Sequence, residues 1–598
     1  MCGIFIALAK DTTVDSAACR RALATMHWRG PDFMFSRVWE DRLFLGQTVL
    51  SITGDAHSSG EHQRSPSGRY DMLFNGEIYN FRELQERFLG TSAQLKPRHG
   101  TDTEVLTNLH DVLSPAEVPP FLDGMYAYAV FDAAARRMYL VRDPQGEKSL
   151  YVYEDAHWLV AASEIRAIQT FLPGIPLDAQ ALRDYFRTRH LMLPGRSAFQ
   201  GIRQLDPGTI ETIELDSLEH STIQAVRLPD WISSRRLEAN AQRPIESLVD
   251  ELDHLLTRCV REMVPPTRRF AAVVSGGIDS SLIAHYLLQE GNPELLVAVN
   301  HVGKDRISAE LSGFEHALGR PITIVPVDPA AYAAEIWRCQ QSCGAPLHSH
   351  SFVGQAVQSA LVRSTGCRVL FGGDGADEFF GGYDAYLRAQ DPAGHFSPSP
   401  YSGYQSSPLE FQEDAPEGYQ EQLAAAWAQA LDAYAFVTAP HHRARLAAMY
   451  ADAVYQLPEV GLRGADLMSM MWSVETRSVY LRRPIIEFAL NLPATAKVDD
   501  AAEPLLQTKT LLKQLFLRYF PRELLVEKQG FAGFPNESAL CLGDPHDYLA
   551  LKALAVHAPS LRSAWADRST AWKLINTEYF LRYSGLVNST VPGMSPVC

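Results

Sequence analysis

Short apolar or alternating segments, separated by polar, glycine and proline residues, fill residues 2–172. Alternation with a period of two residues is typical of β-strands that bury one face. Helical spacing interrupts these segments at about residues 14–27 and 80–89. We therefore predict an α+β domain over residues 2–172, with antiparallel sheets stacked as a sandwich. Its expected strands read CGIFIAL, RLFLGQTVLSI, YDMLFNGEI, MYAYAVFD and RMYLVRD.

From residue 245 onward, long helical patterns alternate with compact apolar segments. FAAVV (270–274) and CRVLFGG (367–373) read as parallel strands covered on both faces, each leading into a loop that contains glycine. We predict an α/β domain over residues 245–598 that ends in helices, and we interpret residues 173–244 as a connector. Residues 390–416 are rich in serine, proline and glycine, which predicts a loop.

Length and composition exclude several classes of protein. A chain of 598 residues exceeds a single hydrophobic core, so two or three domains are expected. The net charge of -16 disfavours a nucleic-acid partner. No apolar segment is long enough to span a membrane, and the N-terminus lacks the basic segment of a signal peptide, so we expect a cytoplasmic protein. The eight cysteines are scattered, which argues against a disulfide framework.

The segment VVSGGIDSS (273–281) has the chemistry of a phosphate-binding loop. Glycines allow the backbone to approach a phosphate closely, and the amides at the start of the following helix point toward the anion. The spacing differs from that of a Walker loop. A glycine-rich turn between strand and helix without a ligand is the alternative.

A second glycine-rich loop, GGDGADEFFGGY (372–383), carries three acids, Asp374, Asp377 and Glu378. Carboxylates at a strand end suit Mg²⁺, which prefers one or two of them together with phosphate oxygens. Because ligands gather at the carboxyl ends of parallel strands, the two loops together predict a Mg-nucleotide site. A solvated acidic turn is the alternative.

These motifs of the second half resemble the synthetase domain of glutamine-dependent asparagine synthetases. SGGIDSS is similar to their PP-loop, and the resemblance extends through GDGADEFFGGY, SVETRS (473–478), KTLLK (509–513) and KQGFAGFP (528–535). In that family ATP adenylates a carboxylate, pyrophosphate leaves, and a nitrogen nucleophile attacks the acyl-AMP. The resemblance implies that ATP and pyrophosphate bind to Val274, Ser275, Gly276, Gly277, Asp279, Ser280, Gly372 and Gly373, and Mg²⁺ to Asp279, Asp377 and Glu378.

The resemblance also implies two catalytic residues in this half. Asp374 stands where the family has an acid important for the acyl-adenylate step, and Lys509 where a lysine stabilises charge on the phosphates and the acyl intermediate. On spacing alone, Lys509 would read as a surface lysine of a helix.

The first half resembles the glutaminase domain of the same family, which has the N-terminal-nucleophile fold. The matching motifs occur in order: MCGIF, HWRGPD, FNGEIYN, GTDTEV and RDPQGEKSLY. The resemblance implies that Cys2 becomes the first residue, with its own α-amine as general base for the thiol. It further implies an oxyanion hole from Asn75 and Gly76, and glutamine binding by Asn75, Gly76, Glu77 and Asp102, with Asp102 taking the α-ammonium group. A buried small hydrophobic residue is the alternative for Cys2.

Two departures from the family pattern bear on function. Val49 stands where the family has an arginine that binds the glutamine carboxylate, and Arg29 or Arg64 are candidates to replace it. In the second half the family's EVRVPFLD reads ETRSVYLR (475–482), and AVNHVG (298–303) also differs. These changes fall near the expected acyl site, so we expect a specialised carboxylic acid rather than aspartate as substrate.

The leading hypothesis is a glutamine- and ATP-dependent amidotransferase that converts a small-molecule carboxylic acid to an amide. One alternative is an ATP-dependent enzyme that closes a β-lactam or macrolactam ring while its glutaminase half is idle. The others are an ordinary asparagine synthetase and a regulator that binds ligands without catalysis. We expect a homodimer, although no residue of the sequence indicates it.

Overall fold

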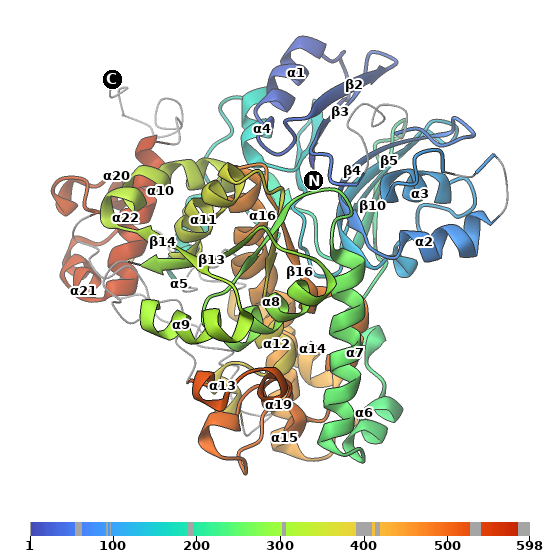
Figure 1. Ribbon diagram of the computed structural model, residues 1–598. Helices are drawn as coiled ribbons and strands as arrows, with labels where there is room; N and C mark the ends of the chain where they lie inside the picture. The colour runs from blue at the N-terminus through green and yellow to red at the C-terminus, as the bar shows by residue number, and fades with distance from the viewer. Residues whose placement is uncertain are drawn as a thin grey trace.

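The computed structural model contains two antiparallel sheets in the first half and one parallel sheet in the second (Figure 1). It describes residues 2–53, 63–90, 94–95, 97–187, 195–301, 307–389, 409–412, 419–526 and 540–583. Of the expectations above, KQGFAGFP and most of residues 390–416 lie outside this described part. None of the helices described there combines the length and the hydrophobicity needed to cross a bilayer.

The first antiparallel sheet has six strands in the order β2-β3-β1-β8-β7-β9. Its central strand, β1, pairs with β3 so that Cys2 lies opposite Val49. The amides of Gly3 and Ile4 donate to Thr48 Oγ1 at 3.1 Å and to Ser163 Oγ at 3.0 Å, which fixes the start of β1. The strands are β1 (Cys2–Ala9), β2 (Phe33–Trp39), β3 (Leu43–Val49), β7 (Tyr151–Glu154), β8 (Trp158–Ala162) and β9 (Ile202–Gln204).

The second antiparallel sheet has the order β11-β10-β6-β5-β4 and packs against the first. Alternate residues of both sheets, such as Ile4 and Ile6 on one and Ala127 and Ala129 on the other, fill one hydrophobic cluster between them. The strands are β4 (Tyr70–Ile78), β5 (Gly124–Asp132), β6 (Arg137–Arg142), β10 (Thr209–Glu214) and β11 (His220–Gln224). Because β9 to β11 join these sheets, the sheets of the first half extend to Gln224, past the expected boundary at residue 172.

Helices cover the outer faces of both sheets. On the first sheet lie α1 (Ser16–Ala24), whose N-terminus is capped by Asp15, and α4 (Ile165–Phe171). On the second lie α2 (Phe81–Leu84), the π-helical turn Gln85–Leu89 and α3 (Asp102–Leu109). The helices expected at about 14–27 and 80–89 are therefore confirmed.

The parallel sheet has the order β14-β13-β12-β15-β16. The expected strands FAAVV and CRVLFGG are its neighbouring strands β12 and β15, with Phe270 opposite Val369, and the prediction of a parallel sheet is confirmed. The strands are β12 (Phe270–Val273), β13 (Leu295–His301), β14 (Ile322–Val327), β15 (Val369–Gly372) and β16 (Glu475–Ser478).

Helices make up most of the rest of the chain after residue 179. Those between residues 179 and 364 are α5 (Ala179–Arg187), α6 (Ser234–Ala241), α7 (Ile245–Met263), α8 (Ile278–Glu290), α9 (Ile307–Leu318), α10 (Pro329–Cys343) and α11 (Ser351–Ser364). Those between residues 376 and 470 are α12 (Ala376–Phe380), α13 (Asp384–Arg388), α14 (Tyr419–Ala433), α15 (Pro440–Ala451), the π-helix Asp452–Leu462 and α16 (Arg463–Met470). The last are α17 (Arg483–Leu490), α18 (Ala494–Lys497), α19 (Thr510–Tyr519), α20 (Leu549–Ala553), α21 (Leu561–Ala566) and α22 (Arg568–Tyr583). Short 3-10 turns are Pro119–Phe121, Leu228–Trp231, Val479–Leu481, Pro504–Leu506, Arg522–Leu524, Pro545–Asp547 and Ala558–Ser560.

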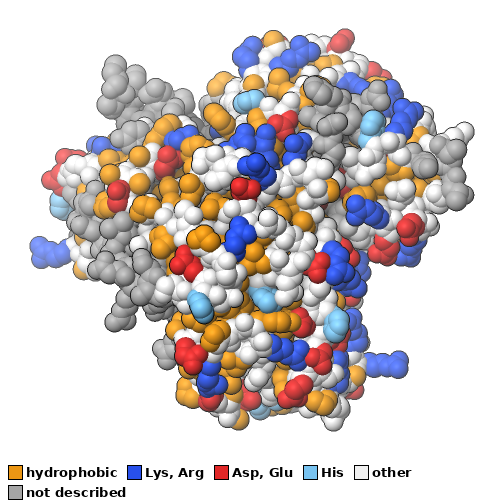
Figure 2. Space-filling view, in the orientation of Figure 1, with side chains coloured by type: hydrophobic (Ala, Val, Ile, Leu, Met, Phe, Trp, Pro, Cys, Tyr) orange, Lys and Arg blue, Asp and Glu red, His pale blue; other side chains and the backbone are white. Residues whose placement is uncertain are grey.

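The two halves share a hydrophobic core. One cluster contains Phe5 and Tyr151 of the first half together with Cys339, Leu467 and Trp572 of the second. The start of β1 lies toward the middle of the molecule, where the halves meet (Figure 1). In the space-filling view, hydrophobic side chains also reach the surface over the middle of the face shown (Figure 2).

Candidate active site

Cys2 lies at the buried start of β1, beside β4. Its backbone N–H donates to Asn75 Oδ1 at 2.9 Å, and its carbonyl accepts from Arg29 Nε at 3.0 Å. Cys2 is 7% exposed. The sequence therefore brings Cys2 and Asn75, which are 73 residues apart, into direct contact.

Asn75 and Gly76 lie on β4, the edge strand of the second sheet, where they pair with Ala127 and Tyr126 of β5. Because Asn75 Oδ1 accepts from Cys2, its Nδ2 is left over, and this buried N–H group has no hydrogen-bond partner among the described residues. A Cβ atom at Gly76 would lie 2.1 Å from the carbonyl oxygen of Met125 on β5, so only glycine fits there. The amide donor of Asn75 is thus buried, fixed and available beside Cys2.

Two further acids line this part of the first half. Asp102, at the first position of α3, accepts from the amide of Ile78 at 3.0 Å, and Glu77 accepts from Thr53 Oγ1 at 2.8 Å. Burial, and next the charge of Asp102, raise the pKa of Glu77 to about 8. Burial likewise raises the pKa of Asp102. A buried acid pair of this kind gains a charged partner when it binds an ammonium group.

Arg29 and Arg64 were the candidates to replace the cation missing at Val49. Neither lies in position to do so. Arg29 is fully buried, and its Nη2 donates to both carboxylate oxygens of Asp466 on α16, at 2.9 and 3.0 Å. Arg64 donates to the carbonyl of Gly68 and lies 3.9 Å from Asp71, at the opposite end of β4 from Glu77. The positions of Arg29 and Arg64 therefore do not support the suggestion that one of them substitutes, because Arg29 binds Asp466 and the Cys2 carbonyl, and Arg64 lies beside Asp71.

The first half also meets the second through two arginines of the segment ETRSVYLR. Arg477 of β16 lies 3.2 Å from Glu77, and its Nε donates to Glu475 at 2.7 Å. Arg482 donates to Asp123, which precedes β5, and stacks on Tyr79, with 4.8 Å between its guanidinium carbon and the ring centre. The sequence shows that Arg482 departs from the family pattern. It does not show that Arg482 binds Asp123, which is 359 residues away.

The SGG segment lies at the carboxyl end of β12, as its sequence predicts. Gly276 has a φ of +80°, a conformation that favours glycine, and Gly277 precedes the first residue of α8. Among the described residues, no side chain caps this helix start. Instead, Ser280 Oγ accepts from the amide of Ser275 at 3.0 Å and lies 3.0 Å from Ser275 Oγ. The amides at the start of α8 are left for another acceptor.

The loop after β15 lies directly against this segment. A Cβ atom at Gly373 would approach Asp279 Cβ to 3.0 Å and the amide nitrogen of Ser280 to 3.2 Å. Asp374 is half-buried nearby and accepts from Ser478 Oγ at 3.2 Å. Burial raises the pKa of Asp374, and the charges of Asp377 and Asp279 raise it further. Val274, Ser275, Gly276, Gly277, Asp279, Ser280, Gly372, Gly373 and Asp374 therefore gather at one edge of the sheet.

Lys509 joins the two loops. Its Nζ lies 2.5 Å from Asp279 Oδ2 and 2.6 Å from Asp377 Oδ1. The residue is buried, and its φ of +50° turns the chain into α19. Although burial opposes the charged form, the two carboxylates raise the pKa of Lys509 above its usual value. Lys509 is thus a buried cation in the loop cluster rather than a lysine on a helix surface.

The three acids expected to bind a metal do not converge on one point. Asp279 and Asp377 face Lys509, whereas Glu378 accepts from Tyr383 Oη at 2.6 Å. Within the described part of the chain, no group of three or more metal-ligating side chains is arranged around a common centre. The two aspartates offer hard oxygen donors next to the SGG segment, and this donor set fits Mg²⁺.

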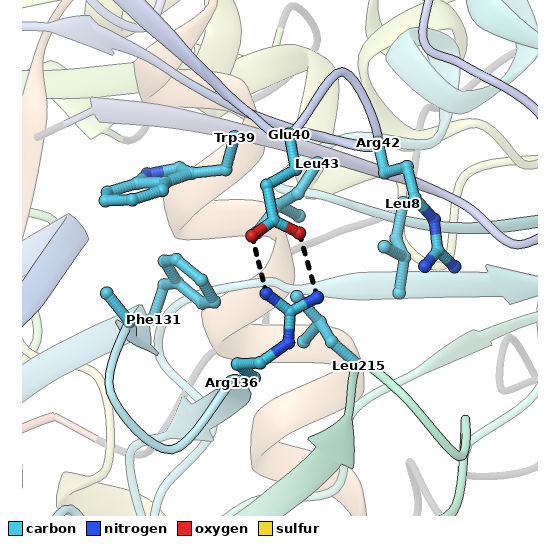
Figure 3. Close-up of a pocket in the computed structure, with 9 residues that line it drawn as sticks. Leu8, Trp39, Glu40, Arg42, Leu43, Phe131, Arg136 and Leu215 are labelled. Atoms are coloured by element: carbon cyan, nitrogen blue, oxygen red, sulfur yellow. Dashed lines mark hydrogen bonds and ion pairs between the residues drawn. The ribbon is translucent and has the colours of Figure 1, made fainter.

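A cavity in the first half lies away from these groups. Leu8, Trp39, Phe131 and Leu215 line it, and Glu40 and Arg136 close it with paired hydrogen bonds (Figure 3). Leu8 lies near the far end of β1 from Cys2, so the cavity is about 20 Å from the thiol. None of the predicted site residues lines it.

Family models match both halves of the chain. Residues 1–223 match a glutamine amidotransferase domain, and residues 251–582 match an asparagine synthase domain.

Similar proteins carry asparagine synthetase names. A Mycobacterium bovis protein with a provisional name as a glutamine-hydrolysing asparagine synthetase is 28% identical over 391 residues. That match covers 62% of this chain but only 57% of the relative. The glutamine-hydrolysing asparagine synthetase of Gallus gallus is 24% identical, over 66% of this chain and 68% of its own. Among solved structures, the glutamine phosphoribosylpyrophosphate amidotransferase of B. subtilis is 13% identical over 54% of this chain and 65% of its own, but the TM-score of 0.28 does not establish a shared fold.

Proposed function

The chain belongs to the asparagine synthase family, and on this premise we propose that it is a glutamine-dependent, AMP-forming amidotransferase. It adenylates a carboxylic acid with ATP and converts the acyl-AMP to an amide with ammonia released from glutamine. The observation that carries the proposal is the contact of Cys2 with Asn75, which leaves a buried amide donor beside the thiol.

The first half, an N-terminal-nucleophile sandwich in this proposal, hydrolyses glutamine. After removal of Met1, the α-amine of Cys2 takes the thiol proton, and the thiolate attacks the glutamine amide. Asn75 Nδ2 and the amide of Gly76 stabilise the oxyanion that forms. Glu77 and Asp102 bind the α-ammonium group of glutamine.

The second half, a PP-loop ATP pyrophosphatase domain, forms the acyl-AMP. The segment Val274–Ser280 binds the pyrophosphate part of ATP through its backbone amides and serine hydroxyls, and Gly372 and Gly373 lie against the nucleotide. Lys509 stabilises negative charge that develops on the phosphates. The raised pKa of Asp374 favours its neutral form. Asp374 takes part in proton transfer when the nitrogen nucleophile attacks the acyl group.

Mg²⁺ fits the oxygen donors at this edge of the sheet. Asp279 and Asp377 would hold it, and when bound it would neutralise charge on the phosphates. Glu378 supports this site through Tyr383 rather than as a direct ligand.

The acyl substrate in this proposal is a specialised carboxylic acid of a biosynthetic pathway. Ser478 of the altered segment bonds Asp374, and Arg482 lies four residues further along. An ordinary asparagine synthetase is the alternative. ATP–pyrophosphate exchange that responds to aspartate far better than to larger carboxylic acids would favour that alternative.

The first experiment is glutamate release from labelled glutamine, on protein shown by mass spectrometry to begin at Cys2. We expect release by the wild-type protein and none by Cys2→Ala. Release that is absent from the wild-type protein, with or without ATP and candidate acids, would contradict the proposal.

One observation favours a second function. Val49 lies opposite Cys2, and its uncharged side chain stands where the family has the arginine that binds the glutamine carboxylate. The candidate is an ATP-dependent enzyme that joins an amine and a carboxylate of one substrate into a ring. A product that has lost water but gained no nitrogen from ¹⁵N-labelled glutamine would identify it.

A further inference from the structure

Gln47 is a buried amide that links the two sheets of the first half. It lies on β3, where its backbone is opposite Ile4 of β1 on one side and Phe35 of β2 on the other. Because side chains alternate along a strand, Gln47 shares its face with Leu43 and Leu45, which belong to the hydrophobic cluster between the sheets. Gln47 is 1% exposed, so its side chain continues this row into the space between the sheets.

The side chain of Gln47 binds one residue of the second sheet through two hydrogen bonds. Its Nε2 donates to the carbonyl oxygen of Phe74 on β4 at 2.8 Å, and its Oε1 accepts from the amide of Phe74 at 2.9 Å. β4 is an edge strand of that sheet, and an edge strand presents N–H and C=O groups that no neighbouring strand pairs. Gln47 therefore takes the place of a neighbouring strand at Phe74, the residue directly before Asn75.

The same open edge of β4 carries the amide of Gly76. In an antiparallel strand, every second residue directs its N–H group to the same edge. The amide of Phe74 donates to Gln47, and that of Ile78 donates to Asp102 at 3.0 Å. Gly76 lies midway between Phe74 and Ile78, so its N–H group points toward this edge, between two side chains that fix the strand.

The next residue of β3 holds the strand that carries Cys2. Thr48 is fully buried, and its Oγ1 accepts from the amide of Gly3 at 3.1 Å. The amide of Cys2 in turn donates to Asn75 Oδ1 at 2.9 Å. Gln47 and Thr48 thus fix, from one strand, both sides of the contact between Cys2 and Asn75.

We propose that Gln47 is a positioning residue for glutamine hydrolysis, which holds β4 so that Asn75 and Gly76 lie beside Cys2. Its hydrogen bonds go to Phe74, so it acts through the placement of the two donors rather than on the reacting atoms. The inference rests on the proposed function, because that function assigns the oxyanion hole to Asn75 and Gly76. Donors to an oxyanion act in the transition state, so displacing them lowers kcat and leaves KM unchanged.

The first test is Gln47→Met, since methionine has a similar length but forms neither hydrogen bond. We expect kcat for glutamate release to fall about 10–100-fold, with KM for glutamine within about twofold of the wild-type value. A Gln47→Met protein whose kcat stays within about twofold of the wild-type value would overturn the proposal.

Gln63→Met is the matched control. Gln63 is 5% exposed, and its backbone carbonyl accepts from the amide of Met72 at 2.7 Å on the same edge of β4. Its side-chain Oε1, however, has no hydrogen-bond partner in the described part of the chain. The same substitution at this buried glutamine should therefore keep the wild-type kcat.

A double-mutant cycle separates positioning from a general loosening of the fold. In Asn75→Ala, one of the donors that Gln47 positions is absent, so adding Gln47→Met should lower the remaining kcat by less than about threefold. A substitution that only loosens the first half lowers kcat by the same factor in both backgrounds, and that outcome would overturn the proposal. Circular dichroism at the assay temperature checks that each variant is folded.

A crystal structure of Gln47→Met tests the placement without any activity. We expect the distance between Cys2 N and Asn75 Oδ1, 2.9 Å in the wild-type protein, to exceed about 3.5 Å. An unchanged distance would overturn the proposal. Because this measurement uses no glutamine, a wild-type protein that releases no glutamate would contradict the proposed function alone.

Discussion

Arg482, in the second half, donates two hydrogen bonds, of 2.6 and 2.9 Å, to Oδ2 of Asp123 in the first half. The arginine is 2% exposed and also donates to Glu262 of α7 at 2.6 Å. Burial opposes its charge, but Asp123 and Glu262 hold the pKa of Arg482 above its usual value. This pair is therefore a buried, charge-assisted contact between the halves.

Removing the arginine should destabilise the protein strongly. Arg482→Met leaves Asp123 buried without its cation, and breaking a buried pair in this way costs about 3–5 kcal/mol. The midpoint of urea unfolding measures the loss. We expect the double variant Arg482→Met, Asp123→Asn to recover part of it, and a single variant as stable as the wild-type protein would show that the pair contributes nothing.

Asn75 should be needed for glutamine hydrolysis but not for folding of the synthetase half. Asn75→Ala removes the buried Nδ2 donor, and loss of one oxyanion donor lowers kcat by about 10²–10³-fold. Glutamate release under saturating glutamine measures the effect. ATP–pyrophosphate exchange serves as the control and should stay within about twofold of the wild-type rate. A variant that releases glutamate at the wild-type rate would remove Asn75 from the oxyanion hole.

Glutamine use should rise with pH through the pKa of Glu77, which is about 8. Below that pH the carboxyl is protonated and cannot pair with the α-ammonium group, so kcat/KM for glutamine should rise about tenfold or more between pH 6.5 and 8.5. Glu77→Gln should lower kcat/KM and abolish this rise. A pH profile that is flat for the wild-type protein would show that Glu77 does not bind the ammonium group.

Val49→Arg should improve glutamine binding. Val49 offers no charge where the family has an arginine for the glutamine carboxylate, and a charge-assisted partner is worth about 2–5 kcal/mol. We expect KM for glutamine to fall at least about tenfold, with kcat little changed. Val49→Leu is the matched control and should leave KM unchanged. An unchanged KM in the arginine variant would mean that the carboxylate binds elsewhere.

Lys509→Met should abolish formation of the acyl-AMP. The substitution removes the cation that Asp279 and Asp377 share. Acyl-AMP formation then lacks the positive charge that stabilises the phosphates. We expect ATP–pyrophosphate exchange to fall by about 10³-fold or more. Glutamate release from Cys2 is the control, and its parallel loss would instead indicate that the variant has unfolded.

Local patterns predicted the strands that carry the site residues, because period-two alternation and the glycine-bounded apolar segments depend only on neighbouring residues. Cys2 on the first strand, and the two glycine-rich loops at the ends of β12 and β15, follow from such patterns. The pairing of strands far apart in the chain did not. β9 to β11 read as a connector because nothing local shows that they complete sheets begun at Cys2 and Tyr70.

The charged groups at the contact between the halves show the same limit. Arg29 reads as a free cation near Cys2, yet its carboxylate partner Asp466 is 437 residues away. Arg477 likewise reaches Glu77 only because β16 adds to the parallel sheet. The partner of a buried charge is set by tertiary packing, which desolvates both groups, and no spacing rule along the chain encodes it.

The short strand β16 therefore takes part in the parallel sheet of the second half and also contacts the first half. One edge bonds β15 of the parallel sheet, and its Arg477 side chain reaches the first half. In evolutionary terms, one half cannot be exchanged for that of another protein without matching changes in the other half. A gene fusion that supplied a foreign first half would have to bring acids matching Glu77 and Asp123, or leave Arg477 and Arg482 without the acids that they bind across the contact. Residues 77–123 and 475–483 should accordingly be inherited, transplanted and redesigned together.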